Sequence, residues 1–256
     1  MELIKQSFYL NEIAKLDSSC GDFYTYKVDK RYGNGKSVLF RVANGIYLSF
    51  NDLEFTKNIY NNTNISKIFT ETLLKIEYCR DGFMFGKNID HKECQVRTGE
   101  ATYSVINNDF CEIYSKEKVY KGITVVSTIK SISKIYEDVF GIDAKEIREF
   151  YNQINLRNDF LAMKIDFNTE NFLNELQEAY NKKDVDTIRL KFYQLLLYEF
   201  RNISEKIGGT NLYLSKSTIN KVVEIEKYIK RHLGEKLSID FISRKFSISP
   251  DILKKS

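Results

Sequence analysis

The hydrophobic pattern of the chain changes period near residue 130, and this change constrains the fold more than any other feature. Before it, short segments rich in Val, Ile, Tyr, Phe and Thr alternate apolar and polar residues, as half-buried strands do. These segments are 23–29, 37–43, 45–50, 73–79, 101–107 and 122–129. After it, apolar residues recur every three or four positions, which is the helical period. The sequence therefore predicts an α+β protein whose strands precede its helices.

Turn residues separate the strand segments. They occur in YGNGK (32–36), ANG (43–45) and RDG (80–82), and GNGK is interpreted as a hairpin turn. The Asn-rich residues 51–68 are expected to form a loop or an irregular edge. Many short strands at fairly regular spacing predict an antiparallel barrel or sandwich over residues 1–130.

Helical periodicity covers residues 131–208. The expected helices are 131–140, 143–154, 168–181 and 184–208, with Asn168 or Thr169 capping the third and Asp184 the fourth. The apolar stripe of the fourth helix broadens over 195–200. Such a stripe is typical either of a helix buried in its own domain or of one shared with a second copy of the chain. The second interpretation predicts a homodimer contact through Ile188, Phe192, Leu195, Leu196 and Phe200.

The positive charge of the chain lies at one end. Net charge is +4 over 256 residues, yet residues 216–256 hold ten Lys or Arg and five Asp or Glu. A local excess of this kind is typical of a surface that meets a polyanion, although a solvated Lys-rich face gives the same count.

Several classes of protein are disfavoured by what the sequence lacks. It has no run of eighteen apolar residues and no signal-peptide pattern, so we expect a cytoplasmic protein without a membrane partner. Four cysteines without a CxxC pair are expected to be reduced thiols. Only His91 and His232 are present, and catalytic and phosphate-loop motifs are missing. We therefore expect no enzyme, no metal site and no cofactor.

The last segment has the pattern of a helix-turn-helix. GGTNLYLSKS (208–217) lacks a helical period, which predicts a linker over 209–216. A first helix follows, with its apolar face at Val222, Ile225, Tyr228, Ile229 and Leu233. Ser238 caps a second helix over 239–246, whose inward residues are expected to be Ile239, Ile242 and Phe246. Ile248 fills the turn, and Ser249 and Pro250 begin a third helix.

This segment, IEKYIKRHLGEKLSIDFISRKFSISPDILKK, resembles the start of the AraC-type DNA-binding domain. The resemblance lies in the Tyr228–Ile229 pair, the Leu237–Ser238 cap, the small Ser243, the Ser249–Pro250 helix start and Leu253. Upstream, LLKIEYCRDGFMFG and VYKGITVVSTI resemble the regulatory domain of the siderophore (pyochelin) regulator subgroup. That likeness implies a cupin-like β-barrel followed by helices.

The resemblance implies a ligand-responsive, sequence-specific transcriptional regulator. Its partners would be DNA, a small-molecule effector and a second copy of the chain. The family joins two helix-turn-helix units, and only the first begins here, so 217–256 is expected to be a DNA-binding domain truncated within that first unit. DNA contacts are implied for Asp251, Lys254 and Lys255. The alternative is a ligand-binding or dimerisation module that binds no DNA itself and acts through mixed dimers.

The effector would bind inside the barrel, against side chains that point inward from the strands. With the register that the alternation suggests, these are Tyr47, Phe50, Ile76, Tyr78 and Tyr103. The prediction depends entirely on that register, because a shift by one residue moves every side chain to the opposite face.

Overall fold

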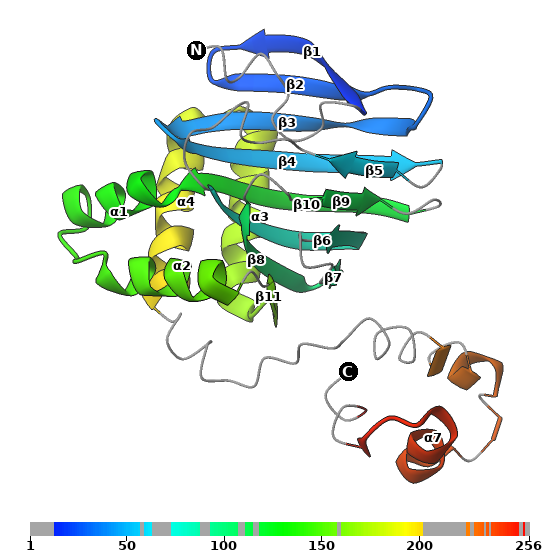
Figure 1. Cartoon of the computed structure of the whole chain (residues 1–256). Helices are drawn as coiled ribbons and strands as arrows, with labels where there is room; N and C mark the ends of the chain where they lie inside the picture. Colours follow the sequence, from blue (N-terminus) through cyan, green and yellow to red (C-terminus); the bar gives the residue numbers. More distant parts are fainter. Residues whose placement is uncertain are drawn as a thin grey trace. The chain divides into compact units, whose positions relative to one another are not determined.

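The structure is a computed structural model. It describes residues 13–56, 59–62, 73–87, 93–106, 111–114, 118–157 and 160–201, and then 224–225, 228–232, 234–235, 237–250 and 253. The chain divides into two compact units, Met1–Gly209 and Thr210–Ser256. Figure 1 labels their helices and strands.

The first unit is built around a large antiparallel sheet. Its strands are β1 (Ala14–Cys20), β2 (Phe23–Val28), β3 (Gly33–Ala43), β4 (Ile46–Phe55), β5 (Ile59–Asn62), β6 (Leu73–Lys87), β7 (Glu93–Arg97), β8 (Glu100–Ile106), β9 (Cys111–Tyr114), β10 (Lys118–Thr128) and β11 (Phe160–Lys164). The main path runs β1-β2-β3-β4-β10-β6-β8-β11, and every pairing is antiparallel. Each of the six predicted strand segments overlaps one of these strands and extends beyond it by at most one residue.

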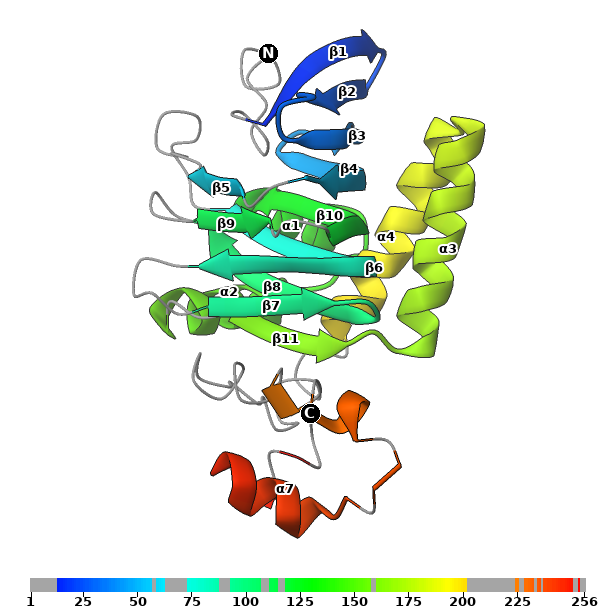
Figure 2. The ribbon, with the colours of Figure 1, turned by 90° about the vertical axis from the view of Figure 1, so that its right-hand side faces the viewer.

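The central strand β6 pairs with different strands along its length. Its first part, Leu73–Cys79, pairs with β8 and β10, and Phe83–Lys87 pairs with β7, with β9 beside the last residues. The register shifts where β10 passes from Lys121 to Gly122, which bends the ladder. Figure 2 shows β5, β9 and β7 together with this second part of β6.

The predicted barrel is corrected to an open sheet. β1 and β11 end the pairing path, and no ladder between described strands joins them. The loop expected over 51–68 is also wrong in part, because β4 continues to Phe55 and β5 starts at Ile59. GNGK is not a turn but the start of β3, where Gly33 and Gly35 lie against the β4 backbone. A Cβ at these glycines would meet a carbonyl oxygen at 1.9 or 2.2 Å, so only glycine allows this approach.

Four helices follow the main strands. They are α1 (Ile129–Asp138), α2 (Lys145–Arg157), α3 (Phe167–Lys182) and α4 (Val185–Arg201). The cap of α3 is Asp166, whose side chain accepts from the Thr169 backbone N–H, rather than Asn168 or Thr169. Asp184 caps α4 as predicted, because its Oδ1 accepts from the Thr187 N–H at 3.1 Å. The segment expected to be wholly helical also contains β11, which pairs with β8.

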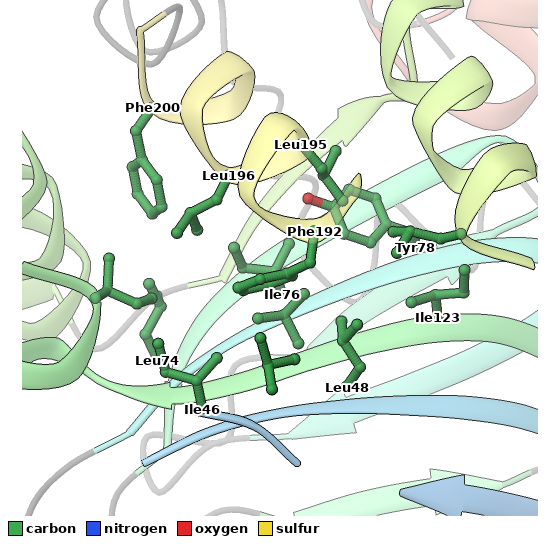
Figure 3. Packing of buried hydrophobic residues seen from close by; sticks show 14 of the residues in the cluster. Ile46, Leu48, Leu74, Ile76, Tyr78, Ile123, Phe192, Leu195, Leu196 and Phe200 are labelled. Atoms are coloured by element: carbon green, nitrogen blue, oxygen red, sulfur yellow. The ribbon is translucent and has the colours of Figure 1, made fainter. Parts of the chain in front are cut away.

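All four helices pack on one face of the sheet, which we call the helix-covered face. Alternate residues of β3, β4, β6, β8 and β10 form one hydrophobic cluster with side chains from α1, α2, α3 and α4. Figure 3 shows Phe192, Leu195, Leu196 and Phe200 of α4 close to Ile46, Leu74 and Ile76 of the sheet. Alternation along each strand sends the intervening residues to the opposite face, which we call the far face.

The α4 residues predicted to form a dimer contact are therefore misassigned. Ile188, Phe192, Leu195, Leu196 and Phe200 are each at most 2% exposed, within the core of their own chain. Burial against the sheet stabilises each such side chain by about 1.5–3 kcal/mol. A second copy of the chain cannot contact them without unfolding this core.

The second unit contains α7 (Ile239–Phe246) and the helical residues on either side of it. Ser238 caps α7 as predicted, and its hydroxyl accepts from the Phe241 N–H at 3.1 Å. Ile248 is buried with Ile225 and Ile242, as expected for the residue that fills the turn. Ile239 was expected to face inward but is 45% exposed. Val222 and Leu233 lie outside the described residues.

Substitution of Gly82 tests the close approach of β6 to β10 at the register shift. Its φ is +87°, and a Cβ there would lie 1.5 Å from the carbonyl oxygen of Val119. Gly99 has a similar φ of +80° with open space around it. In urea denaturation, we expect Gly99→Ala to lower the free energy of unfolding by about 1 kcal/mol and Gly82→Ala by about 3 kcal/mol or more. Equal losses would show that β6 and β10 do not approach in this way.

Candidate functional site

The far face carries a group of buried polar side chains that we call the polar stripe. It crosses five neighbouring strands, β3, β4, β10, β6 and β8. Its members are Ser37, Ser49, Asn51, Thr124, Lys75, Glu77, Thr102 and Ser104. Each is at most 6% exposed, so the stripe has the burial of a core and the chemistry of a surface.

Strand register brings these residues together. Ser49 of β4 lies opposite Thr124 of β10, Thr124 lies opposite Glu77 of β6, and Glu77 lies opposite Thr102 of β8. These four residues form one continuous row across the sheet. Lys75 lies opposite Ser104 in the next row. Directly opposed side chains are close enough to interact, so the stripe is one cluster rather than scattered polar positions.

Hydrogen bonds connect the β3, β4 and β10 members of the stripe. The Ser37 hydroxyl donates to Asn51 Oδ1 at 2.7 Å, and the Ser49 hydroxyl donates to the same oxygen at 2.9 Å. Asn51 Nδ2 donates to the Thr124 hydroxyl at 3.0 Å. A carbonyl oxygen that accepts twice and an amide that donates across strands fix the orientation of Asn51.

Lys75 and Glu77 form a buried ion pair on β6. Lys75 Nζ lies 2.9 Å from Glu77 Oε2, and the two side chains are 0% and 4% exposed. Burying two charges costs several kcal/mol, and their attraction repays this only with good geometry and further hydrogen bonds. A buried pair of this kind is therefore an inefficient way to stabilise a core.

Apolar and aromatic residues surround the polar stripe. A second hydrophobic cluster on the far face includes Tyr26, Leu53, Tyr120 and Val126, together with Val96 of β7. The presence of Val96 shows that β7 covers part of this face. Burial raises the pKa of Tyr26 to about 12 and, with the nearby Glu77 charge, the pKa of the Cys79 thiol to about 12. Both groups are therefore protonated at neutral pH.

Most of the predicted ligand residues lie on the opposite side of the sheet. Phe50, Ile76, Tyr78 and Tyr103 belong to the helix-covered core, whereas Tyr47 packs at the far face. The predicted register was therefore inverted by one residue for four of the five. The polar stripe gave a signal in sequence, because Ser49, Asn51, Lys75, Glu77 and Thr124 alternate with apolar residues. That alternation was interpreted only as the pattern of half-buried strands.

The helix-covered face contains one polar cluster, centred on the buried carboxylate of Glu199 in α4. Tyr103 of β8 donates its hydroxyl hydrogen bond to Glu199 Oε2, and Thr169 of α3 donates to Oε1 at 2.8 Å. Tyr78 of β6 is hydrogen-bonded to Tyr103. Burial raises the pKa of both tyrosines well above the ordinary value, so their hydroxyls remain donors. The cluster joins β6, β8, α3 and α4.

In the second unit, local contacts position the start of the third helix. The Ser243 hydroxyl donates to the Ile248 carbonyl at 2.6 Å, and Ser247 adopts a left-handed conformation with φ of 49°. The Leu253 N–H donates to the Ser249 carbonyl at 3.2 Å, which is the first helical hydrogen bond after the turn. Asp251, Lys254 and Lys255, the predicted DNA contacts, lie outside the described residues.

The part of the chain that the structure describes contains neither a cluster of metal ligands nor a membrane-spanning helix. Within those ranges, His, Cys, Asp and Glu do not gather in a group of three or more that could hold a metal ion. None of the helices in the described part of the chain is long and apolar enough to span a membrane.

Comparison with known proteins finds solved structures that resemble this chain. No family model and no curated protein matches the chain. The AraC-like transcriptional activator CuxR is similar with 11% identity and a TM-score of 0.37, covering 94% of this chain and 77% of that one. Fatty-acid-bound ToxT from Vibrio cholerae has 14% identity and a TM-score of 0.39, with 83% and 73% covered. Ectoine synthase from P. lautus has 13% identity and a TM-score of 0.29, with 47% and 75% covered.

Likenesses of this size do not assign a function, so the functional proposal depends on the residues of the chain itself.

The Glu199 cluster makes a testable contribution to stability. Tyr103→Phe keeps the ring but removes a buried donor to a carboxylate, so we expect the free energy of unfolding to fall by about 1.5–3 kcal/mol. Tyr193→Phe is the control, because the described contacts of Tyr193 are made by its ring. It should change the value by less than about 0.5 kcal/mol in the same urea titration. Similar effects of the two substitutions would contradict the assignment.

Proposed function

We propose that the chain is a ligand-responsive, sequence-specific DNA-binding transcriptional regulator of the AraC type. The first unit binds the effector at the polar stripe, and the second unit contacts DNA. The observation that carries the proposal is the helix-turn-helix of the second unit, because its capping and core residues coincide with the motif on which the sequence resemblance depends.

Three contacts in the second unit support this reading. Ser238 caps α7, Ser243 binds the Ile248 carbonyl, and Ile248 packs with Ile225 and Ile242. Together they hold the turn between α7 and the helix that begins at Pro250. In a helix-turn-helix, the helix after this turn enters the major groove with its first residues toward the bases. In the sequence, Asp251, Lys254 and Lys255 follow closely after Pro250.

The polar stripe supports the effector-binding half of the proposal. Eight buried polar side chains on one face contrast with the apolar cluster on the other face of the same strands. Ligand sites typically combine a few converging polar groups with an apolar and aromatic surround, which is the composition of the far face.

The proposed regulator also forms a homodimer. Because the inner residues of α4 are buried in the core, we place the dimer contact on the outer side of this helix. Its exposed or half-buried residues Asp186, Leu190, Tyr193, Leu197 and Arg201 recur at intervals of three and four, and we call them the outer stripe. Leu190 is 56% exposed. In an antiparallel pair of α4 helices, Asp186 of each copy would lie opposite Arg201 of the other. The outer stripe is thus complementary to itself in charge.

DNA binding is tested by the salt dependence of affinity. Each lysine that contacts a phosphate adds about one unit to the slope of log affinity against log salt. We expect Lys254→Ala and Lys255→Ala each to weaken binding of the chain to a fluorescent duplex in anisotropy titrations. The slope should fall by about one unit for each phosphate contact that is lost.

Lys134→Ala, on the exposed side of α1, is the matched control and should leave affinity and slope unchanged. If the chain shows no DNA affinity at low salt, the regulator proposal fails for this chain. The alternative, a module that acts through mixed dimers, would then be favoured.

Dimerisation is tested by sedimentation velocity. Leu190→Glu places a charge at the exposed leucine of the outer stripe and should raise the dimer dissociation constant at least about tenfold, equivalent to about 1.4 kcal/mol. Phe167→Glu removes a side chain that is 76% exposed at the start of α3, outside the stripe, and should have no effect. A native chain that stays monomeric at high concentration would contradict the assignment.

A further inference from the structure

We infer that Asp22 is a positioning residue, which holds the first half of α4 and thereby the dimer contact of the outer stripe. Asp22 lies in the turn between β1 and β2, distant from α4 in the sequence. The inference rests on the proposed function, in which the outer stripe binds a second copy of the chain. It goes further by naming the contact through which the first hairpin of the sheet acts on that surface.

The Asp22 carboxylate binds two arginines from different elements. Arg41 of β3 donates to Asp22 Oδ1 from Nε at 3.0 Å and from Nη2 at 2.7 Å. Arg189 of α4 donates to Asp22 Oδ2 from Nη2 at 2.7 Å. Hydrogen bonds between ionised groups at these distances are among the stronger polar contacts in proteins. One side chain of the first hairpin therefore joins the sheet to α4.

Two further contacts fix the guanidinium of Arg189. Its Nε donates to the Val42 carbonyl at 3.2 Å, and its Cζ lies 5.6 Å from the centre of the Phe40 ring. The side chains of Arg189 and Asp22 are 33% and 22% exposed, so both are mostly withdrawn from water. A planar guanidinium with several fixed neighbours differs from a surface ion pair, in which two long side chains must be ordered for a single contact.

The corner between α3 and α4 meets the sheet at the same place. Lys183 caps the end of α3 in a left-handed conformation with φ of 57°, which is unfavourable for a residue that has a Cβ. Its Nζ lies 3.9 Å from the centre of the Tyr180 ring and 4.8 Å from that of Phe23. Phe23 directly follows Asp22, so two consecutive residues of the first hairpin contact cations from the two sides of this corner.

The position of the first half of α4 decides the geometry of the outer stripe. The Glu199 cluster anchors the second half of the helix, whereas Arg189 anchors the first half to the sheet. Arg189 directly precedes Leu190 and follows Asp186 by three residues, and both of these belong to the outer stripe. In the antiparallel pair, the first half of each α4 lies against the second half of the other. A change at Asp22 would therefore act twice in each dimer.

The test compares Asp22→Asn with Asp17→Asn by hydrogen exchange of the α4 amides, measured on the diluted whole chain. Asp22→Asn keeps the shape of the side chain and removes its charge. Asp17→Asn also removes a charge from the first hairpin, but its partner is Lys27 of β2 at 3.0 Å rather than a residue of α4. We expect Asp22→Asn to speed exchange over 185–191 at least about threefold and to leave 195–201 unchanged. The control should leave both ranges unchanged.

Sedimentation velocity of the same variants gives the second readout. Asp22→Asn and Arg189→Gln should each raise the dimer dissociation constant at least about threefold. The double variant should be no weaker than either single variant, because both substitutions remove one shared contact. Asp17→Asn should leave the constant unchanged. A purely structural role of Asp22 would instead speed exchange over the whole of α4.

Unchanged exchange in Asp22→Asn would overturn the inference, as would faster exchange with an unchanged dimer constant. Additive losses from Asp22→Asn and Arg189→Gln would also overturn it, because Arg189 would then contact the second copy directly. If the native chain stays monomeric at every concentration, the dimer proposal fails together with the role of Asp22 in that contact. Exchange on the diluted chain still decides whether Asp22 holds α4, so the two failures are distinguishable.

Discussion

The antiparallel pairing of β6 with β10 and β8 is the constraint on which the rest of the first unit depends. This register decides that Ile76 and Tyr78 face the helices, whereas Lys75 and Glu77 face the opposite side. A slip by one residue would bring two charges under α4 and expose apolar side chains. The core, the polar stripe and the attachment of the helices are therefore fixed by one ladder of hydrogen bonds.

Two clusters of buried polar side chains lie on opposite faces of these strands. On the far face, the ion pair of β6 lies beside the hydroxyls of β8 and β10. On the helix-covered face, Tyr78 and Tyr103 of β6 and β8 connect to Glu199 of α4. Glu77 and Tyr78 are neighbours in the chain, so the polar stripe is one residue away from the cluster that anchors α4. The outer stripe lies on the other side of that helix, so the polar stripe and the outer stripe belong to one continuous set of packed elements.

Much of the sheet was predictable, but its edges and faces were not. Segments such as 37–43 and 73–79 combine β-branched and aromatic residues with clear alternation, and both form strands. β1 was missed because AKLDSSC is polar and mostly exposed, and β11 because five residues between two helices carry too little pattern. The barrel interior was assigned to the wrong face, since alternation alone does not state which side the helices cover. Four predicted ligand residues and five predicted dimer residues proved to be core for this reason.

The sequence by itself determined the helix-turn-helix, because the interactions that define it are local. The Ser238 hydroxyl accepts from the Phe241 N–H and the Ser243 hydroxyl donates to the Ile248 carbonyl, both within five residues, so the spacing of these residues was sufficient. Only the tertiary structure decided which face of the sheet is polar and buried, and which side of α4 remains exposed. The sequence pattern shows that a strand has an apolar and a polar face, but it does not show which face the helices cover. It likewise does not show which side of a helix packs against the sheet. Packing of α1–α4 against one side of the sheet made that choice.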